Sequence, residues 1–217
     1  MALKLYGHPF SSYTWKALIP LYAHDPPFDF RSLEDVSIEE AQFVQEASPQ
    51  GKFPVLVDDG VTIFEATSII EHLAAHQLAA SGLIPAASDE ALAVRMMDRV
   101  FDNYVMNLMQ EGVNEAIRTS GKPDRAVMSE VQRRLERTYA WLDAWLADYQ
   151  RPSQVTLIEC AAAPSLFYAD WVHRITDAWP RLRDWRAHLL ALPAISRCVE
   201  NARPYRPNFP LGAPDRD

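Results

Sequence analysis

The stretch 51–73 constrains the fold more than any other part of this sequence. It contains two short runs rich in β-branched residues, 55–57 and 61–64, which favour strands. Asp59-Gly60 lies between them and favours a tight hairpin turn, because glycine readily adopts positive φ. Apolar residues at helical spacing follow, at Ile69, Ile70 and Leu73. The stretch therefore predicts a strand, a turn, a second strand and a helix.

The residues before this stretch predict two further strands and two helices. Residues 3–6 alternate apolar and polar side chains, and 28–31 also have a strand-like pattern. Residues 14–24 and 37–47 place apolar side chains on one side at helical spacing. The resulting order, β-α-β-α-β-β-α, predicts a thioredoxin-like domain over residues 1–79.

A second, all-helical domain is predicted after a linker. Residues 80–88 are mostly small, with one glycine and one proline, as expected of a linker. Strand signals almost vanish over residues 89–217, which predict a helical bundle. Its first two helices are expected over 89–118 and 124–149.

The rest of the second domain contains one clear helix start. Thr156 and Glu159 match a capping box, in which the side chain of each residue bonds the backbone of the other. The apolar run 160–172 follows and predicts a buried helix. The tail 203–217 is rich in proline, and we expect it to be irregular.

A resemblance to a known family rests on the motif at 51–56, Gly-Lys-x-Pro-Val-Leu, with the Asp-Gly turn and Glu65 before the apolar helix. Together these features resemble the glutathione-binding half of cytosolic glutathione transferases. The resemblance implies a cis bond before Pro54 and backbone pairing of Phe53 with the cysteinyl part of glutathione. It also implies that Lys52 reaches the glycyl carboxylate and that Glu65 holds the γ-glutamyl ammonium.

One position departs from the family pattern. The family usually has serine directly after this glutamate, where its hydroxyl holds the γ-glutamyl carboxylate, whereas this chain has Ala66. The backbone N–H of Ala66 still donates, and the hydroxyl of Thr67 is a possible substitute. A lost neutral hydrogen bond costs about 0.5–1.5 kcal/mol. We therefore expect weakened, not abolished, glutathione binding.

The reaction of the family needs a hydrogen-bond donor beside the thiol of glutathione. A free thiol has a pKa of about 8.5, so a donor must favour the thiolate. The run 11–16, Ser-Ser-Tyr-Thr-Trp-Lys, resembles the Ser-Ser-x-x-Trp-Arg stretch of zeta-class members, whose first serine activates the thiol. This points to Ser11, with Ser12 in reserve and Tyr13 third. The structural alternative for these serines is a helix N-cap.

The electrophile is expected to bind between the domains, beside the first and central helices of the second domain. Aromatic and aliphatic side chains fall on one side of each helix and are candidates to line this pocket, although such stripes are more often plain core. The candidates are Phe101, Tyr104, Val105, Leu108, Tyr168 and Trp171.

Composition excludes several other classes of function. The net charge of −8 argues against nucleic acid as a partner, because phosphate binding needs basic patches. No apolar run is long enough to span a bilayer, and we expect no membrane partner. Cys160 and Cys198 lie far apart and form no disulfide framework, which favours the reducing cytoplasm. The histidines show no metal-ligand spacing, so no metal is predicted.

The leading hypothesis is a serine-type glutathione transferase, similar to the zeta and theta classes, that acts on a small hydrophobic electrophile. A glutathione-dependent isomerase or dehalogenase uses the same thiolate and stays open. A non-catalytic protein that binds glutathione or a hydrophobic ligand is the third hypothesis. The resemblance also implies a homodimer.

Overall fold

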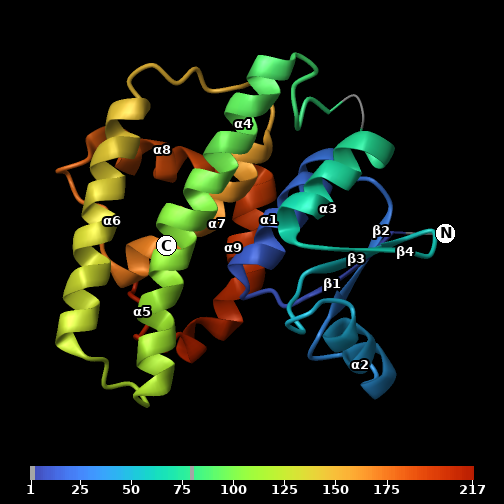
Figure 1. The fold of residues 1–217 in the computed structure, drawn as a ribbon, viewed down its shortest axis with the longest axis horizontal. Helices are drawn as coiled ribbons and strands as arrows, with labels where there is room; N and C mark the ends of the chain where they lie inside the picture. Colours follow the sequence, from blue (N-terminus) through green and yellow to red (C-terminus); the bar gives the residue numbers. More distant parts are fainter. Residues whose placement is uncertain (1–2, 79–80) are drawn as a thin grey trace.

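The computed structural model describes residues 3–78 and 81–217, and it divides into a sheet-containing part and a helical part (Figure 1). The first part begins with β1 (Leu3–Gly7), α1 (Ser12–His24), β2 (Phe28–Ser32) and α2 (Ile38–Glu46). It continues with β3 (Val55–Asp58), β4 (Val61–Phe64) and α3 (Ala66–His72), followed by the π-helical turn η1 (Leu73–Gln77). This order confirms the predicted β-α-β-α-β-β-α pattern.

The four strands form one mixed sheet in the order β2-β1-β3-β4. β1 is parallel to β2 and antiparallel to β3, while β3 and β4 form the predicted hairpin, with Val55 opposite Phe64. One face of the sheet packs with α1 and α3, and the other is covered by α2 (Figure 1). This arrangement places the entrance to β3 and the start of α1 at the side of the sheet that faces the helical part.

The helical part begins at Ser88, the last residue of the predicted linker 80–88, and the described linker residues 81–87 precede it. Its helices are α4 (Ser88–Phe101), α5 (Asn107–Arg118), α6 (Arg125–Trp145), α7 (Leu157–Val172), α8 (Pro180–Ala191) and α9 (Pro193–Ala202). The π-helical turn η2 (Asp102–Met106) joins α4 to α5, so the predicted helix 89–118 contains an irregular turn at its centre. Residue 79, the predicted end of the first domain, lies outside the described residues.

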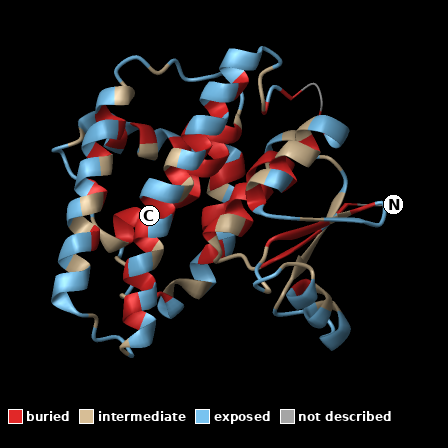
Figure 2. Cartoon of the chain, viewed as in Figure 1, coloured by how far each residue is buried: buried red, intermediate tan, exposed pale blue. Residues whose placement is uncertain are grey.

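The helix α7 is the centre of the helical part. Every residue from Leu157 to Trp171 is buried (Figure 2), as expected for a helix that is apolar all round. The predicted capping box is confirmed: Thr156 Oγ1 accepts from the Ile158 N–H at 3.2 Å, and Glu159 Oε2 accepts from the Thr156 N–H at 2.9 Å. One continuous core joins α7 to α1 and to the sheet.

The prediction that the tail is irregular is wrong for its first part. A 3-10 helix, η3 (Arg203–Asn208), continues directly from α9. Two of its residues, Pro204 and Pro207, are prolines, and the fixed φ of proline is compatible with a 3-10 turn. The tail beyond it returns to the protein, because Phe209 is buried in the main core.

Candidate functional site

The loop between β1 and α1 is held firmly against the helix that follows it. Gly7 permits this close approach, because a Cβ there would lie 2.6 Å from the side chain of Thr14. The His8 N–H donates to Thr14 Oγ1 at 3.3 Å, and Trp15 Nε1 donates to the carbonyl oxygen of Pro9 at 2.6 Å. The loop therefore presents its residues in a defined position.

Ser11 is the N-cap of α1. Its Oγ accepts a hydrogen bond from the Thr14 N–H at 3.2 Å. The helix N-cap role, which the sequence offered as the structural alternative for this serine, is therefore observed. It does not exclude a second role, because a hydroxyl that accepts one bond still has its own hydrogen to donate. The positive end of the helix dipole lies at the same place and favours a negative charge nearby.

The two reserve candidates follow directly on α1. Ser12 is 9% exposed and Tyr13 is half-buried. The Tyr13 hydroxyl donates to Asn107 Oδ1 at 3.5 Å. Burial, and then the charges of Asp102 and Glu65, raise the pKa of the Tyr13 phenol far above its usual value. Tyr13 therefore stays protonated and can act only as a neutral donor.

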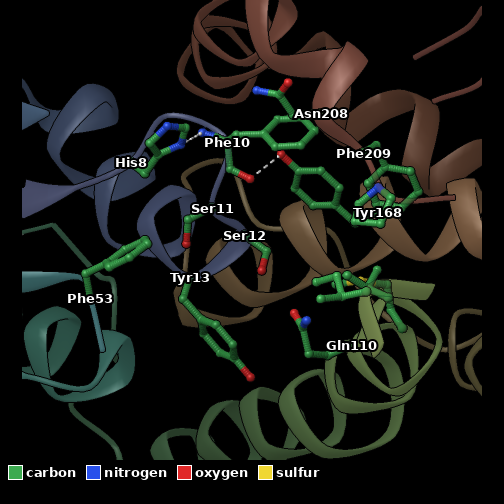
Figure 3. A pocket seen from close by; sticks show the side chains of 14 residues that line it. His8, Phe10, Ser11, Ser12, Tyr13, Phe53, Gln110, Tyr168, Asn208 and Phe209 are labelled. Carbon is green, nitrogen blue, oxygen red and sulfur yellow. Dashed lines mark hydrogen bonds between the residues drawn. The ribbon is translucent and has the colours of Figure 1, made fainter. Parts of the chain in front are cut away.

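Ser11, Ser12 and Tyr13 border a cavity of about 420 Å³, which we call the apolar cavity (Figure 3). It lies between the β1–α1 loop on one side and α5, α7 and the C-terminal tail on the other. Its other lining residues are His8, Phe10, Phe53, Met109, Gln110, Val113, Ile117, Tyr168, Asn208, Phe209 and Pro210. Aromatic and aliphatic side chains predominate, so the cavity suits an apolar molecule.

A second cavity of about 210 Å³, which we call the charged cavity, adjoins the first. Tyr13 and Phe53 line both cavities, so the two meet beside the start of α1. The other residues of the charged cavity come from the entrance to β3, the β4–α3 junction and the α4–α5 region. They are Ser48, Lys52, Pro54, Phe64, Glu65, Ala66, Arg99, Asp102, Asn103 and Asn107.

The segment before β3 has the expected backbone. The bond between Phe53 and Pro54 is cis, as the resemblance implied. Ser48 fixes this segment, because its Oγ accepts from the Lys52 N–H at 2.9 Å and donates to the Lys52 carbonyl oxygen at 3.3 Å. The side chain of Lys52 is exposed at the rim of the charged cavity. Lys52, Phe53 and Pro54 thus all line the charged cavity.

Glu65 stands at the junction between β4 and α3 with an unusual backbone. Its φ is 68°, in a region that non-glycine residues rarely adopt. Such conformations cost about 1–3 kcal/mol and cluster at functional sites. Glu65 is exposed in the charged cavity, and Ala66, the first residue of α3, lines the same cavity.

Thr67 is not in a position to take the role of the family's serine, which holds the γ-glutamyl carboxylate. Its hydroxyl donates to Asp98 Oδ2 at 3.0 Å and accepts from Arg99 Nη2, and Thr67 is not among the residues that line the charged cavity. The hydroxyl is therefore already occupied by α4. It is not positioned to replace the serine that Ala66 lacks.

A buried group of charges, not foreseen from the sequence, supports this wall of the cavity. Lys16 on α1 is fully buried, and its Nζ lies 2.6 Å from Asp98 Oδ1 and 2.7 Å from Asp102 Oδ1. Arg99 pairs with both carboxylates from the cavity side. Burial raises the pKa of Asp102, while the Lys16 ammonium counteracts that effect. The sequence signal was a lysine that directly precedes the apolar run 17–21.

Of the six residues expected to line the electrophile pocket, the structure brings Tyr168 alone to the apolar cavity. Phe101 and Val105 are fully buried in the core, and Trp171 packs against Phe209 at a ring separation of 5.1 Å. Tyr104 and Leu108 line a different cavity, between α6 and the α4–α5 region. The cavity instead meets later turns of the same helical stripe, at Met109 and Val113, because Ser11 lies beside α5.

Two kinds of feature are absent from the described residues. Among residues 3–78 and 81–217, no cluster of histidine, cysteine and carboxylate side chains is arranged to hold a metal ion. Within the same part of the chain, no helix has the length and apolar character needed to cross a bilayer.

Comparison with known proteins agrees with this geometry. The family model described as the glutathione S-transferase N-terminal domain matches residues 5–79. The chain is 26% identical to the glutathione S-transferase APIC of Nicotiana tabacum over 92% of its own length and 98% of the relative's. Matched to the unclassified glutathione S-transferase 2 of Bombyx mori, the fold gives a TM-score of 0.81 at 17% identity, over 99% and 100% of the two chains.

A third match is to a structure with a bound ligand. This glutathione S-transferase of Methylobacillus flagellatus, solved with glutathione bound, gives a TM-score of 0.75 at 23% identity over 91% of this chain and 98% of that one. The cis-proline segment, the glutamate at the start of α3 and the family-model match all lie in the same N-terminal domain. Residues 5–79 therefore match the glutathione S-transferase N-terminal domain, and the fold of the whole chain is similar to that of solved glutathione S-transferases.

Proposed function

We propose that this protein is a glutathione transferase in which the Ser11 hydroxyl donates a hydrogen bond to the thiol of glutathione and favours its thiolate. One observation carries the proposal: Ser11 Oγ caps α1 and borders the apolar cavity, which shares Tyr13 and Phe53 with the charged cavity. We assign the central, cysteinyl residue of a bound glutathione to the junction of the two cavities, beside this hydroxyl. The positive end of α1 adds to the same stabilisation.

The charged cavity suits the peptide. Glutathione has two carboxylates and one ammonium, and the cavity presents cationic and acidic side chains. Lys52 is assigned to the glycyl carboxylate, and the backbone of Phe53 to the cysteinyl part. Glu65 is assigned to the γ-glutamyl ammonium, and the Ala66 N–H is available to the carboxylate beside it. The strained backbone of Glu65 supports a functional role for this junction.

The apolar cavity suits the second substrate. The thiolate sulfur attacks a carbon of a small hydrophobic electrophile held among Phe10, Tyr168 and Phe209. A carbon–sulfur bond forms, and either a leaving group departs or a proton is taken up from water. The thiol proton has by then passed to solvent. Neighbouring apolar walls exclude water and so strengthen the hydrogen bond from Ser11 to the sulfur.

The finer classification follows from the same residue. A serine donor in this position makes the enzyme a serine-type member, and the run at 11–16 supports a relation to the zeta and theta classes. We place it in the cytoplasm, because both cysteines are free thiols buried in the core, a state that a reducing compartment maintains.

We also propose a homodimer. Large apolar side chains are exposed on β4, α4, η2 and α6, and exposed apolar side chains of this size favour protein–protein contact. These side chains are Val61, Phe64, Leu92, Met96, Tyr104 and Trp141. Sedimentation equilibrium should give twice the chain mass of 24.6 kDa. A mass equal to one chain at micromolar concentration contradicts the dimer but leaves the catalytic proposal intact.

The catalytic proposal is tested by Ser11→Ala beside Ser37→Ala. Ser37 caps α2 with the same geometry, accepting from the Glu40 N–H at 3.2 Å, and it lies outside both cavities. Each variant loses an N-cap worth about 1 kcal/mol. Only Ser11→Ala should lower kcat/KM for conjugation of an activated aryl chloride, by about 10-fold to 100-fold. Equal kinetics in the two variants, with glutathione still bound, contradict the role of Ser11.

A further inference from the structure

The charged cavity offers two cations to a ligand with two carboxylates. Among the described residues that line it, the cationic side chains are Lys52 and Arg99. Lys52 belongs to the segment before β3, whereas Arg99 belongs to α4. The two cations are thus supplied by different walls of the cavity. If Lys52 binds one carboxylate of glutathione, Arg99 is the cation of this cavity that can bind the other.

Arg99 has an unused donor. Its Nε donates to Asp98 Oδ2 at 2.9 Å, and its Nη2 contacts Thr67, Asp98 and Asp102. Nη1 has no hydrogen-bond partner within the described part of the chain, and the side chain is 53% exposed. The guanidinium is therefore held in place from behind while one of its nitrogens remains available to a ligand.

The charges around Arg99 leave it able to attract an anion. Asp98 and Asp102 are also paired with Lys16, at 2.6 Å and 2.7 Å, so Arg99 is not their sole counterion. Asp102 and Glu65 line the same cavity, and both are acids that attract an ammonium. An amino-acid end that carries both an ammonium and a carboxylate matches this arrangement of acids and one arginine.

No side-chain hydroxyl at position 66 or 67 is available to bind this carboxylate. Ala66 has none, and the hydroxyl of Thr67 contacts Asp98 and Arg99. We propose that Arg99 binds the α-carboxylate of the γ-glutamyl residue of glutathione through Nη1, with Lys52 left to the glycyl carboxylate. The inference rests on the proposed function, since it concerns how the same cavity holds the peptide.

The test compares two ligands and two arginines by calorimetry on the full-length protein. The ligands are glutathione and 4-aminobutanoyl-cysteinylglycine, which lacks only the γ-glutamyl α-carboxylate. The variants are Arg99→Gln and Arg95→Gln. Arg95 lies one turn earlier on α4, is 48% exposed and pairs with Glu71 at 2.7 Å, outside the charged cavity. Circular dichroism confirms that each variant is folded.

Arg99→Gln should weaken glutathione binding by about 10-fold or more, because a charge-assisted hydrogen bond is lost. It should leave the affinity for the analogue unchanged or slightly higher. Arg95→Gln should change neither. In the background of Arg99→Gln, Ala66→Ser should recover part of the glutathione affinity, because it adds a donor beside the same carboxylate.

Two results overturn the inference while leaving the proposed function in place. One is unchanged glutathione affinity in Arg99→Gln. The other is an equal loss for glutathione and for the analogue, which indicates a general disturbance of the cavity. Should Arg99→Gln fail to fold, Arg99→Lys keeps the positive charge and is subjected to the same pair of ligands. Failure of the wild-type protein to bind either ligand overturns both the inference and the proposed function.

Discussion

The hydroxyl of Tyr168 on α7 donates to the carbonyl oxygen of Phe10 at 2.8 Å (Figure 3). The two residues are 158 positions apart, so this bond joins the centre of the helical part to the loop that presents Ser11. The rings of Phe10 and Tyr168 also pack edge to face, with their centroids 5.5 Å apart. The position of the candidate catalytic serine therefore depends on both parts of the chain.

Tyr168→Phe tests this connection. The variant keeps the ring contacts and removes the hydroxyl, so the Phe10 carbonyl loses its partner and the protein should lose about 1 kcal/mol of unfolding free energy. The kcat/KM for conjugation should also fall at temperatures at which the variant is folded. Tyr104→Phe is the control, because Tyr104 is 57% exposed. Equal stability of the two variants in urea unfolding contradicts the role of the bond.

Lys16→Met tests the buried charges. Methionine is similar in length to lysine but uncharged, so Asp98 and Asp102 lose the cation that pairs with them on the buried side. Removing one partner of a buried ion pair costs about 3–5 kcal/mol. Urea unfolding should show this loss, whereas Lys4→Met, at an exposed position of β1, should change stability by less than about 0.5 kcal/mol. A Lys16→Met protein as stable as wild type excludes this account of the cluster.

The pH dependence of stability should depend on Asp58. Hydrogen bonds, first with His72 Nε2 at 2.8 Å and then with Gln77 Nε2 at 3.0 Å, lower the pKa of Asp58 below its usual value. In the unfolded chain this carboxyl titrates near its usual pKa of about 3.9. As the pH falls from there through the lower folded-state pKa, protons bind preferentially to the unfolded chain, and stability decreases.

Asp58→Asn removes this contribution, so the variant should lose less unfolding free energy than wild type between pH 5 and the acid transition. At pH 7 it should be about 1–2 kcal/mol less stable, because the hydrogen bonds to a charged acceptor are weakened. Asp148→Asn, in the exposed segment after α6, should follow the wild-type curve. Parallel acid curves for wild type and Asp58→Asn contradict the assignment. Urea unfolding across pH provides these curves.

Local patterns predicted much of the fold. The Asp59-Gly60 turn predicted the β3–β4 hairpin, because turn chemistry is set by two neighbouring residues. Thr156 and Glu159 predicted the start of α7 for the same reason. α1 begins at Ser12, two residues before the predicted start, because the cap at Ser11 precedes the first apolar residue of the helical stripe.

Features built from distant segments were not predicted. The cluster of Lys16, Asp98 and Asp102 requires α1 and α4 to be packed together, and no local pattern reports that packing. The residues of the apolar cavity depend on which turn of α5 lies beside Ser11, which is set by the docking of the two parts of the chain. Helical spacing identified the apolar stripe but not the turn that borders the cavity.

The most direct test of the central claim is the ultraviolet absorbance of the thiolate of glutathione bound to the protein, measured across pH. With wild type and Ser37→Ala, the thiolate signal should persist well below the free thiol pKa of about 8.5. With Ser11→Ala, the midpoint should move upward toward that value, because the donor to the sulfur is lost. The same low midpoint in all three proteins would show that Ser11 does not activate the thiol.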